Sequence, residues 1–130
     1  MAKILICDDD DDMVEFFNRL FTRKGHELVV AQNASDGVAF TVESKPDIVF
    51  MDMNMPVSAG EDVGPFAGLE ATRQIRAHAE VGAIPIVALT GNVMADQREK
   101  ILGAGCNEML EKPIENFADL FDALGRHVSA

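Results

Sequence analysis

The stretch Pro46-Asp47-Ile48-Val49-Phe50-Met51-Asp52-Met53-Asn54-Met55-Pro56 decides the fold. Its short apolar run, residues 48–51, contains β-branched and aromatic side chains, which is typical of a strand buried on both faces. Such strands belong to parallel sheets covered by helices, and ligands bind at the carboxyl edge of these sheets. Asp52 ends the run and is therefore predicted to lie at that edge. A carboxylate there is a candidate nucleophile or metal ligand, although Asp52 taken alone is better explained as a solvated loop residue.

Four other short apolar runs are predicted to complete one parallel sheet, at residues 4–7, 28–31, 84–89 and 108–111. Apolar residues at helical spacing predict a helix after each strand, at about 13–21, Ser35–Ser44, Gly68–Ala79, Val93–Leu102 and 114–124. Right-handed crossovers then give an α/β fold, a three-layer, doubly wound (βα)5 sandwich in which residues 1–130 form one domain. The pattern alone leaves the strand order open.

Two local features of the helical segments carry further expectations. Ser35 is a candidate cap for the second helix, whose inner face is expected to hold Val38, Ala39 and Val42. The segment from Val57 to Ala67 is rich in glycine and acidic residues and is interpreted as an irregular loop.

The net charge of −11 argues against direct binding to nucleic acid or to an anionic membrane, since no basic patch is visible. No apolar run approaches the length of a membrane span, and the start of the chain does not read as a signal peptide. The expected compartment is the cytoplasm. Cys7 and Cys106 fall at opposite ends of their strands, roughly 13 Å apart, so both are expected to be free thiols and not a disulfide.

The predicted carboxyl edge collects several polar side chains. Asp8 and Asp9 follow the first strand, Asp52 the third, Thr90 the fourth and Lys112 the fifth. Three neighbouring carboxylates repel one another unless a cation intervenes, and oxygen ligands at a wet edge suit Mg²⁺. A lysine and a hydroxyl nearby suit the oxygens of a phosphoryl group. Together these groups predict phosphoryl transfer to or through an aspartate.

The chain resembles the receiver domain of two-component response regulators over essentially its whole length. The resemblance rests on Ile4-Leu5-Ile6-Cys7-Asp8-Asp9, Pro46 to Pro56 as quoted above, Gly68-Leu69-Glu70, Pro85-Ile86-Val87-Ala88-Leu89-Thr90-Gly91 and Lys112-Pro113-Ile114. It implies a flavodoxin-like sheet with strand order 2-1-3-4-5.

The resemblance also implies a set of roles at the carboxyl edge. Asp52 would accept a phosphoryl group from a phosphohistidine on a histidine kinase or histidine phosphotransferase. Asp8 or Asp9, together with Asp52 and the backbone carbonyl of Asn54, would hold Mg²⁺.

Three further roles follow from the same resemblance. Thr90 and Lys112 would bind the phosphoryl oxygens, and the Lys112–Pro113 peptide bond would be cis, which aims the lysine. In the family, an aromatic residue three positions before the lysine turns inward on phosphorylation together with the threonine.

The chain departs from the family pattern in two places. Met109 stands at the position of that aromatic, and methionine has neither ring nor hydroxyl to follow Thr90. The segment Val57–Ala67 makes the loop after the third strand longer by about eight residues, well above the usual length. We therefore expect the helix Val93–Leu102 and this loop to respond to phosphorylation more than Met109 does.

No DNA-binding segment follows the last predicted helix, so output is expected through a downstream protein or onward phosphotransfer, by a monomer or weak dimer. Turnover of an external substrate is not expected. The chain is expected to be a stand-alone response regulator, and a receiver domain excised from a hybrid histidine kinase is the main alternative. A haloacid-dehalogenase-like phosphatase is a second alternative, which turnover of small phosphate esters would reveal. A flavodoxin-like electron carrier is a third, which the yellow colour of a bound flavin would reveal.

Overall fold

A central parallel sheet organises the computed structural model, which describes residues 1–64, 66–91, 95–114 and 116–128. The sheet contains β1 (Lys3–Cys7), β2 (Glu27–Ala31), β3 (Ile48–Asp52), β6 (Ile86–Thr90) and β7 (Glu108–Glu111). Their spatial order is β2-β1-β3-β6-β7. Because β4 and β5 belong to a separate two-stranded sheet, this order is the expected 2-1-3-4-5.

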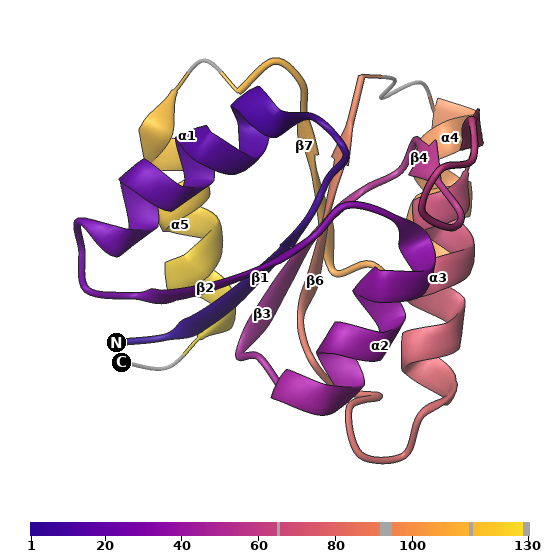
Figure 1. Cartoon of the computed structure of the whole chain (residues 1–130), viewed down its shortest axis with the longest axis horizontal. Helices are drawn as coiled ribbons and strands as arrows, with labels where there is room; N and C mark the ends of the chain where they lie inside the picture. The colour runs from indigo at the N-terminus through magenta and orange to yellow at the C-terminus, as the bar shows by residue number, and fades with distance from the viewer. Residues whose placement is uncertain (65, 92–94, 115, 129–130) are drawn as a thin grey trace.

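Helices cover both faces of the sheet, so the predicted three-layer arrangement is confirmed (Figure 1). One face carries α1 (Asp11–Thr22) and α5 (Phe117–His127). The other carries α2 (Ala34–Ser44), α3 (Ala67–Ala77) and α4 (Ala95–Gly103). Among the described residues, no helix has the length and apolar character needed to cross a bilayer.

The three inner strands are buried on both faces, which explains their continuous apolar runs. Alternate side chains enter two separate apolar clusters, as the two-residue period of a strand requires. The cluster under α1 and α5 receives Ile4, Ile6, Ile48, Phe50, Val87 and Leu89. The cluster under α2, α3 and α4 receives Leu5, Cys7, Val49, Met51, Ile86 and Ala88.

The expected details of α2 are confirmed in part: Val38 and Val42 pack against the apolar cluster, but the expected cap and the inner position of Ala39 were wrong. Asn33 caps the helix, because its side chain accepts a hydrogen bond from the backbone N–H of Asp36 at 2.8 Å. Ser35 instead lies inside the first turn and is exposed. Ala39, further along the helix, is also exposed. The buried positions of α2 are small: a Cβ at Gly37 would come within 2.6 Å of Cys7 Sγ. The helix therefore packs close to β1 through small side chains and not through a large apolar stripe.

Several element boundaries differ from those expected, and one cannot be compared. Helix α3 ends at Ala77 instead of Ala79, and the expected start of α4 at residue 93 lies outside the described residues. Ile114 precedes α5, because Asn116 caps that helix by accepting a hydrogen bond from the N–H of Ala118 at 3.0 Å. An N-terminal cap of this kind fixes the start of a helix more firmly than apolar spacing indicates.

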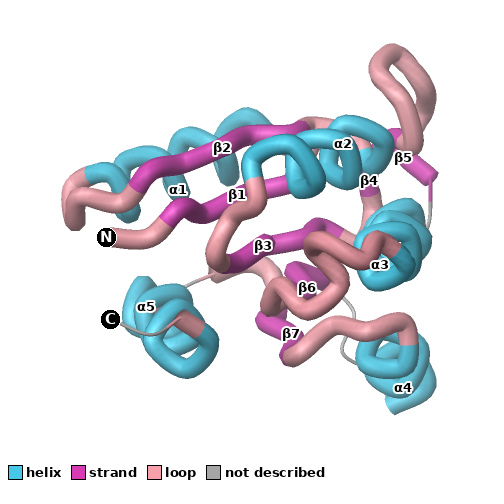
Figure 2. The backbone as a smooth tube through the Cα atoms, turned by 90° about the horizontal axis from the view of Figure 1, so that it is seen from below, coloured by secondary structure: helices cyan, strands magenta, loops and turns pink. Residues whose placement is uncertain are grey.

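The segment expected to be an irregular loop is partly ordered as a hairpin. Strands β4 (Met55–Pro56) and β5 (Val63–Gly64) pair antiparallel, and their connecting loop projects beyond α2 and α3 (Figure 2). The N–H of Ser35 donates to the carbonyl of Val57 at 2.8 Å, and the hydroxyls of Ser35 and Ser58 lie 3.1 Å apart. The first half of the insertion is thus attached to α2.

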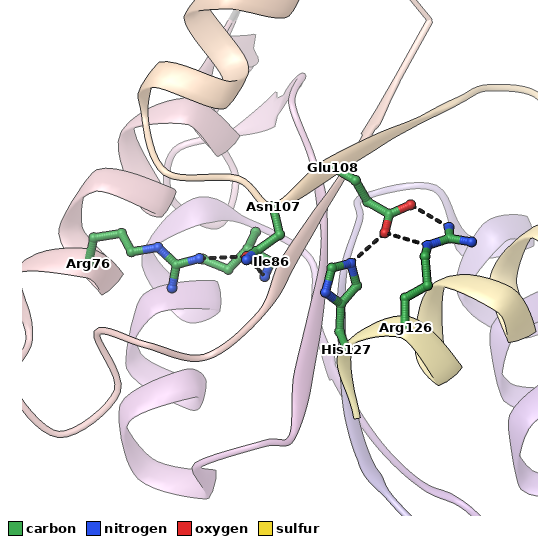
Figure 3. A network of polar contacts seen from close by, with 6 residues as sticks. All are labelled: Arg76, Ile86, Asn107, Glu108, Arg126 and His127. Atoms are coloured by element: carbon green, nitrogen blue, oxygen red, sulfur yellow. Dashed lines mark hydrogen bonds and ion pairs between the residues drawn. The ribbon is translucent and has the colours of Figure 1, made fainter. Parts of the chain in front are cut away.

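Two polar networks lie at the amino ends of β6 and β7, opposite the carboxyl edge of the sheet (Figure 3). The Arg76 guanidinium from α3 donates to the carbonyls of Ile84 and Gly105, and to Oδ1 of Asn107 at 2.9 Å. The same Asn107 oxygen accepts the backbone N–H of Ile86 at 2.8 Å. Arg76 therefore joins α3 to the loops that precede β6 and β7.

The second network attaches the end of α5 to β7. Glu108 accepts hydrogen bonds from Arg126 at 2.6 and 3.1 Å and also contacts His127. The hydrogen bond from Arg126 is the main reason why the pKa of Glu108 lies below its ordinary value.

We predict that Arg76→Met lowers the free energy of unfolding by about 2 to 3 kcal/mol, because several carbonyls lose their donor together. Arg73→Met is the matched control, since Arg73 is exposed and only 3.5 Å from the exposed Glu70; it should cost less than about 0.5 kcal/mol. Urea unfolding followed by circular dichroism measures both. Equal losses in the two variants would show that the network does not stabilise the fold.

Candidate functional site

Three carboxylates meet at the carboxyl edge of the sheet. Asp8 follows β1 and is fully buried, Asp9 is half-buried, and Asp52 ends β3 and is 4% exposed. One carboxylate oxygen from each lies within 4.8 Å of the others. Because β1 and β3 are neighbours in the sheet, Asp8 and Asp52 are brought together by strand pairing itself.

Lys112 faces two of these carboxylates. Its Nζ lies 2.8 Å from Asp8 Oδ2 and 3.4 Å from Asp52 Oδ1, so it is nearer to Asp8. Burial alone would lower the pKa of Lys112, but hydrogen bonding and the charges of Asp8 and Asp52 outweigh it and raise the pKa. The backbone N–H of Lys112 donates to the carbonyl of Thr90 at 2.8 Å, and the Lys112–Pro113 peptide bond is cis.

The position of Asp52 is fixed by its own chain and by α3. The N–H of Asn54 donates to Asp52 Oδ1 at 3.2 Å. Gly68, in the first turn of α3, donates its N–H to the carbonyl of Met53 at 3.1 Å. A Cβ at Gly68 would lie 2.0 Å from the Asp52 carbonyl oxygen, so only glycine permits this close approach.

The electrostatics of the site make Asp52 an unusual carboxylate. Burial is the main cause that raises its pKa from 3.8 to about 7, and the charge of Asp8 adds to the rise. The ammonium of Lys112 and the hydrogen bond from Asn54 act in the opposite direction without cancelling it. One lysine therefore compensates only part of the negative charge collected here.

The donor set fits a hard divalent cation. Asp8 Oδ2 is buried and, apart from its ion pair with Lys112, has no hydrogen-bond partner among the described residues. A cation such as Mg²⁺ takes carboxylate and carbonyl oxygens and retains several waters. Asp8, Asp9 and Asp52 supply such oxygens, and the neighbouring peptide of Asn54 could supply another.

Thr90 and Met109 lie on the two strands that complete the edge. Thr90 is buried at the end of β6, while Met109 lies two residues before the end of β7 and pairs with Ala88. Met109 is partly buried and packs against the apolar cluster under α2, α3 and α4.

Sequence reasoning missed Phe66. Its ring lines a cavity of about 150 Å³ together with Thr90 and Asn54. The only available signal was that this aromatic residue directly precedes the segment containing Gly68.

The two cysteines take no part in the site chemistry. Both are free and buried, as expected. Burial raises the pKa of both thiols, so neither is a reactive thiolate near neutral pH.

Comparisons with known proteins point in one direction. The sequence profile of the response regulator receiver domain matches residues 4–124. Protein PilH of Pseudomonas aeruginosa is 34% identical over 117 residues, which are 88% of each chain. Hybrid signal transduction histidine kinase I of Dictyostelium discoideum is 32% identical over 120 residues, which are 86% of this chain but 6% of that protein.

A solved structure resembles the whole chain. The receiver domain of the sensor histidine kinase PA1611 from Pseudomonas aeruginosa PAO1 superposes with a TM-score of 0.83 at 28% identity. The match covers 99% of this chain and 98% of that one. That crystal structure holds a magnesium ion coordinated in the active-site cleft.

We predict that the stability of the protein reveals the raised pKa of Asp52. Well below pH 3.8 the Asp52 carboxyl is protonated in the folded and the unfolded state, so it does not change the free energy of unfolding. As pH rises from 3.8 to about 7, the unfolded state loses this proton more readily than the folded state, and the protein becomes less stable. Without divalent cations, Asp52→Asn should therefore raise the free energy of unfolding at pH 8, by up to about 4 kcal/mol. The gain should shrink by more than half at pH 5.

Urea unfolding in the presence of a chelator measures this difference, with the exposed Asp62→Asn as the control. Added Mg²⁺ should reduce the advantage of Asp52→Asn at pH 8. An advantage that is the same at both pH values would show that carboxylate repulsion does not destabilise the site.

Proposed function

The chain belongs to the response regulator receiver family, and we propose that it accepts a phosphoryl group on Asp52 from a phosphohistidine of a histidine kinase or histidine phosphotransferase. One observation carries this proposal. Asp52 is a buried carboxylate that faces an ammonium group and two further carboxylates at one sheet edge. Family membership alone does not assign roles to residues, whereas this arrangement suits phosphoryl transfer to a carboxylate.

The proposed reaction is a displacement at phosphorus. A carboxylate oxygen of Asp52 forms the new P–O bond while the P–N bond to the donor imidazole breaks, and the electron pair leaves with the imidazole nitrogen. The Lys112 ammonium and the Thr90 hydroxyl are the groups proposed to bind the phosphoryl oxygens. The backbone hydrogen bond from the Lys112 N–H to the Thr90 carbonyl holds the two residues side by side, which supports this proposal.

We propose Asp8, Asp9, Asp52 and the Asn54 backbone carbonyl as the residues that would hold Mg²⁺. When bound, the ion supplies positive charge that offsets the oxygens of the transferred group. Asp8 and Asp9 themselves remain acceptors of hydrogen bonds and cation contacts, and they do not exchange protons in this scheme.

Output is proposed to pass to a downstream protein, without nucleic-acid binding or turnover of an external substrate. PilH is matched over 88% of its length, which supports action as a separate receiver. The match to 6% of a hybrid histidine kinase supports the alternative, in which the chain is a receiver domain within a larger kinase. The family match favours neither the phosphatase nor the electron-carrier hypothesis. The cytoplasmic location and the monomeric or weakly dimeric state stay predictions.

The metal ligands can be tested by titration with Mg²⁺, followed by amide chemical shifts. Asp9→Ala removes a proposed ligand. Loss of a group that only orients a metal ligand already weakens metal binding by roughly tenfold or more, so Asp9→Ala should weaken Mg²⁺ binding by at least that factor. Asp12→Ala is the matched control, because Asp12 belongs to the same acidic run but is exposed on α1. Equal affinities for the two variants would exclude Asp9 as a ligand.

The phosphoryl acceptor can be tested with Mg²⁺ and acetyl phosphate as the donor. We expect the intact mass of the wild-type protein to increase by one phosphoryl group, and Asp52→Asn to show no increase because the nucleophilic carboxylate is gone. Asp62→Asn should behave as the wild type. Labelling of the Asp52→Asn variant at the wild-type rate would refute the assignment.

A further inference from the structure

A side chain from the insertion lies beside the proposed acceptor site. Phe66, which is 37% exposed, lines the cavity of about 150 Å³ next to Thr90. The other lining residues come from the turn after β3 and from α4: Met53, Asn54, Gln97 and Ile101. The cavity therefore separates the carboxyl edge of the sheet from α4, and Phe66 borders both.

The backbone of Phe66 is held in an uncommon conformation. Its φ of 64° lies in the left-handed region, which bulky side chains rarely adopt. Its carbonyl accepts the N–H groups of Leu69 at 3.0 Å and Glu70 at 3.2 Å at the start of α3, and its own N–H reaches Asn54 Oδ1 at 3.4 Å. These contacts fix the backbone from which the ring projects.

The ring also contacts α4. Lys100 Nζ lies 5.6 Å from the centre of the Phe66 ring, within the range of a cation–π interaction. Ile101, the next residue of α4, is buried and lines the same cavity. A shift of the ring therefore changes its contact with Lys100 and the shape of the cavity that Ile101 also lines.

Met109 is poorly suited to couple the carboxyl edge of the sheet to α4. It packs within the apolar cluster under α2, α3 and α4, but its flexible chain has no ring to take one of two defined positions. Discrete coupling between two sites requires an element with two arrangements. Phe66 has a rigid ring, an adjacent cavity into which it can turn, and a cationic partner on the helix.

We propose that Phe66 is a positioning residue that transmits phosphorylation of Asp52 to α4, and that it serves where Met109 does not. This inference rests on the proposed function. When the Thr90 hydroxyl turns toward the phosphoryl oxygens, the cavity beside it changes shape. The Phe66 ring turns into that space, and its contact with Lys100 and its position relative to Ile101 change with it.

The absence of tryptophan from the chain allows a direct test. Phe66→Trp, Met109→Trp and Phe117→Trp each introduce one fluorophore, and Phe117 serves as the control because it is exposed on α5, across the sheet. Beryllofluoride with Mg²⁺ mimics the phosphoryl group. We expect the emission of Phe66→Trp to shift clearly, that of Met109→Trp to shift by less than half as much, and that of Phe117→Trp to stay constant.

Parallel labelling with acetyl phosphate separates the two proposals. A Phe66→Trp variant that accepts a phosphoryl group but shows no emission shift overturns this inference alone, and so does a larger shift in Met109→Trp. If the wild-type protein accepts no phosphoryl group, the proposed function fails and this inference fails with it.

Hydrogen exchange of α4 gives a second test with variants that should fold. Phe66→Gly removes the ring while suiting the left-handed backbone, Phe66→Tyr retains the ring, and Phe117→Ala is the control. We expect beryllofluoride to change exchange in α4 in the wild type, Phe66→Tyr and Phe117→Ala. Phe66→Gly should lose at least half of that change while Asp52 is labelled normally. A full response in Phe66→Gly would overturn the proposal.

Discussion

Repulsion among Asp8, Asp9 and Asp52 is the constraint on which the rest of the structure depends. Their oxygens approach within 4.8 Å, and two of the three side chains are buried. Lys112 is the cation that the described structure places against them, and its two distances, 2.8 and 3.4 Å, show that it is shared. Because the single positive charge of Lys112 cannot balance three carboxylates, this edge of the sheet should bind a further cation. A divalent cation meets that need at the place where negative phosphoryl oxygens would be added.

The order of the strands makes this concentration of charge possible. β1 lies between β2 and β3, so the direction in which successive strands are added to the sheet reverses at the β1–β3 pair, where crevices form in doubly wound folds. β6 and β7 follow on the far side and bring Thr90 and Lys112 to the same edge. The stabilising interactions lie elsewhere. The Arg76 network and the attachment of α5 through Glu108 both lie near the amino ends of β6 and β7, so they can support the fold without neutralising the site.

The sequence predicted the strands well because full burial imposes continuous apolar runs, and residues 48–52 are an example. It also predicted that Asp8, Asp52, Thr90 and Lys112 would meet, since parallel strands end at a common edge. It failed where local hydrogen bonding competes with pattern. Asn33 and Ser35 are both good caps, and only backbone geometry selects Asn33.

The hairpin in the insertion shows a different limit. Its strands have two residues each, too few for a period to be recognised. The attachment of the hairpin depends on Ser35 of α2, and the place of Phe66 beside the site depends on Asn54 and on Lys100 of α4; these contacts are distant in sequence. The segment from 57 to 67 is therefore the part of the chain whose structure the sequence predicted least.

The site and the insertion depend on different parts of the fold, and this separation bears on how a receiver can change its output. Asp52 and Lys112 are fixed by β3, by the turn after β7 and by the close approach of Gly68, none of which requires the hairpin. The Phe66 ring belongs to the connection that precedes α3, where added residues leave the register of the sheet unchanged. Chemistry at the carboxyl edge can thus stay constant while an inserted connection presents a new side chain to α4. The proposed role of Phe66 in place of Met109 is therefore compatible with an unchanged set of charges at the site.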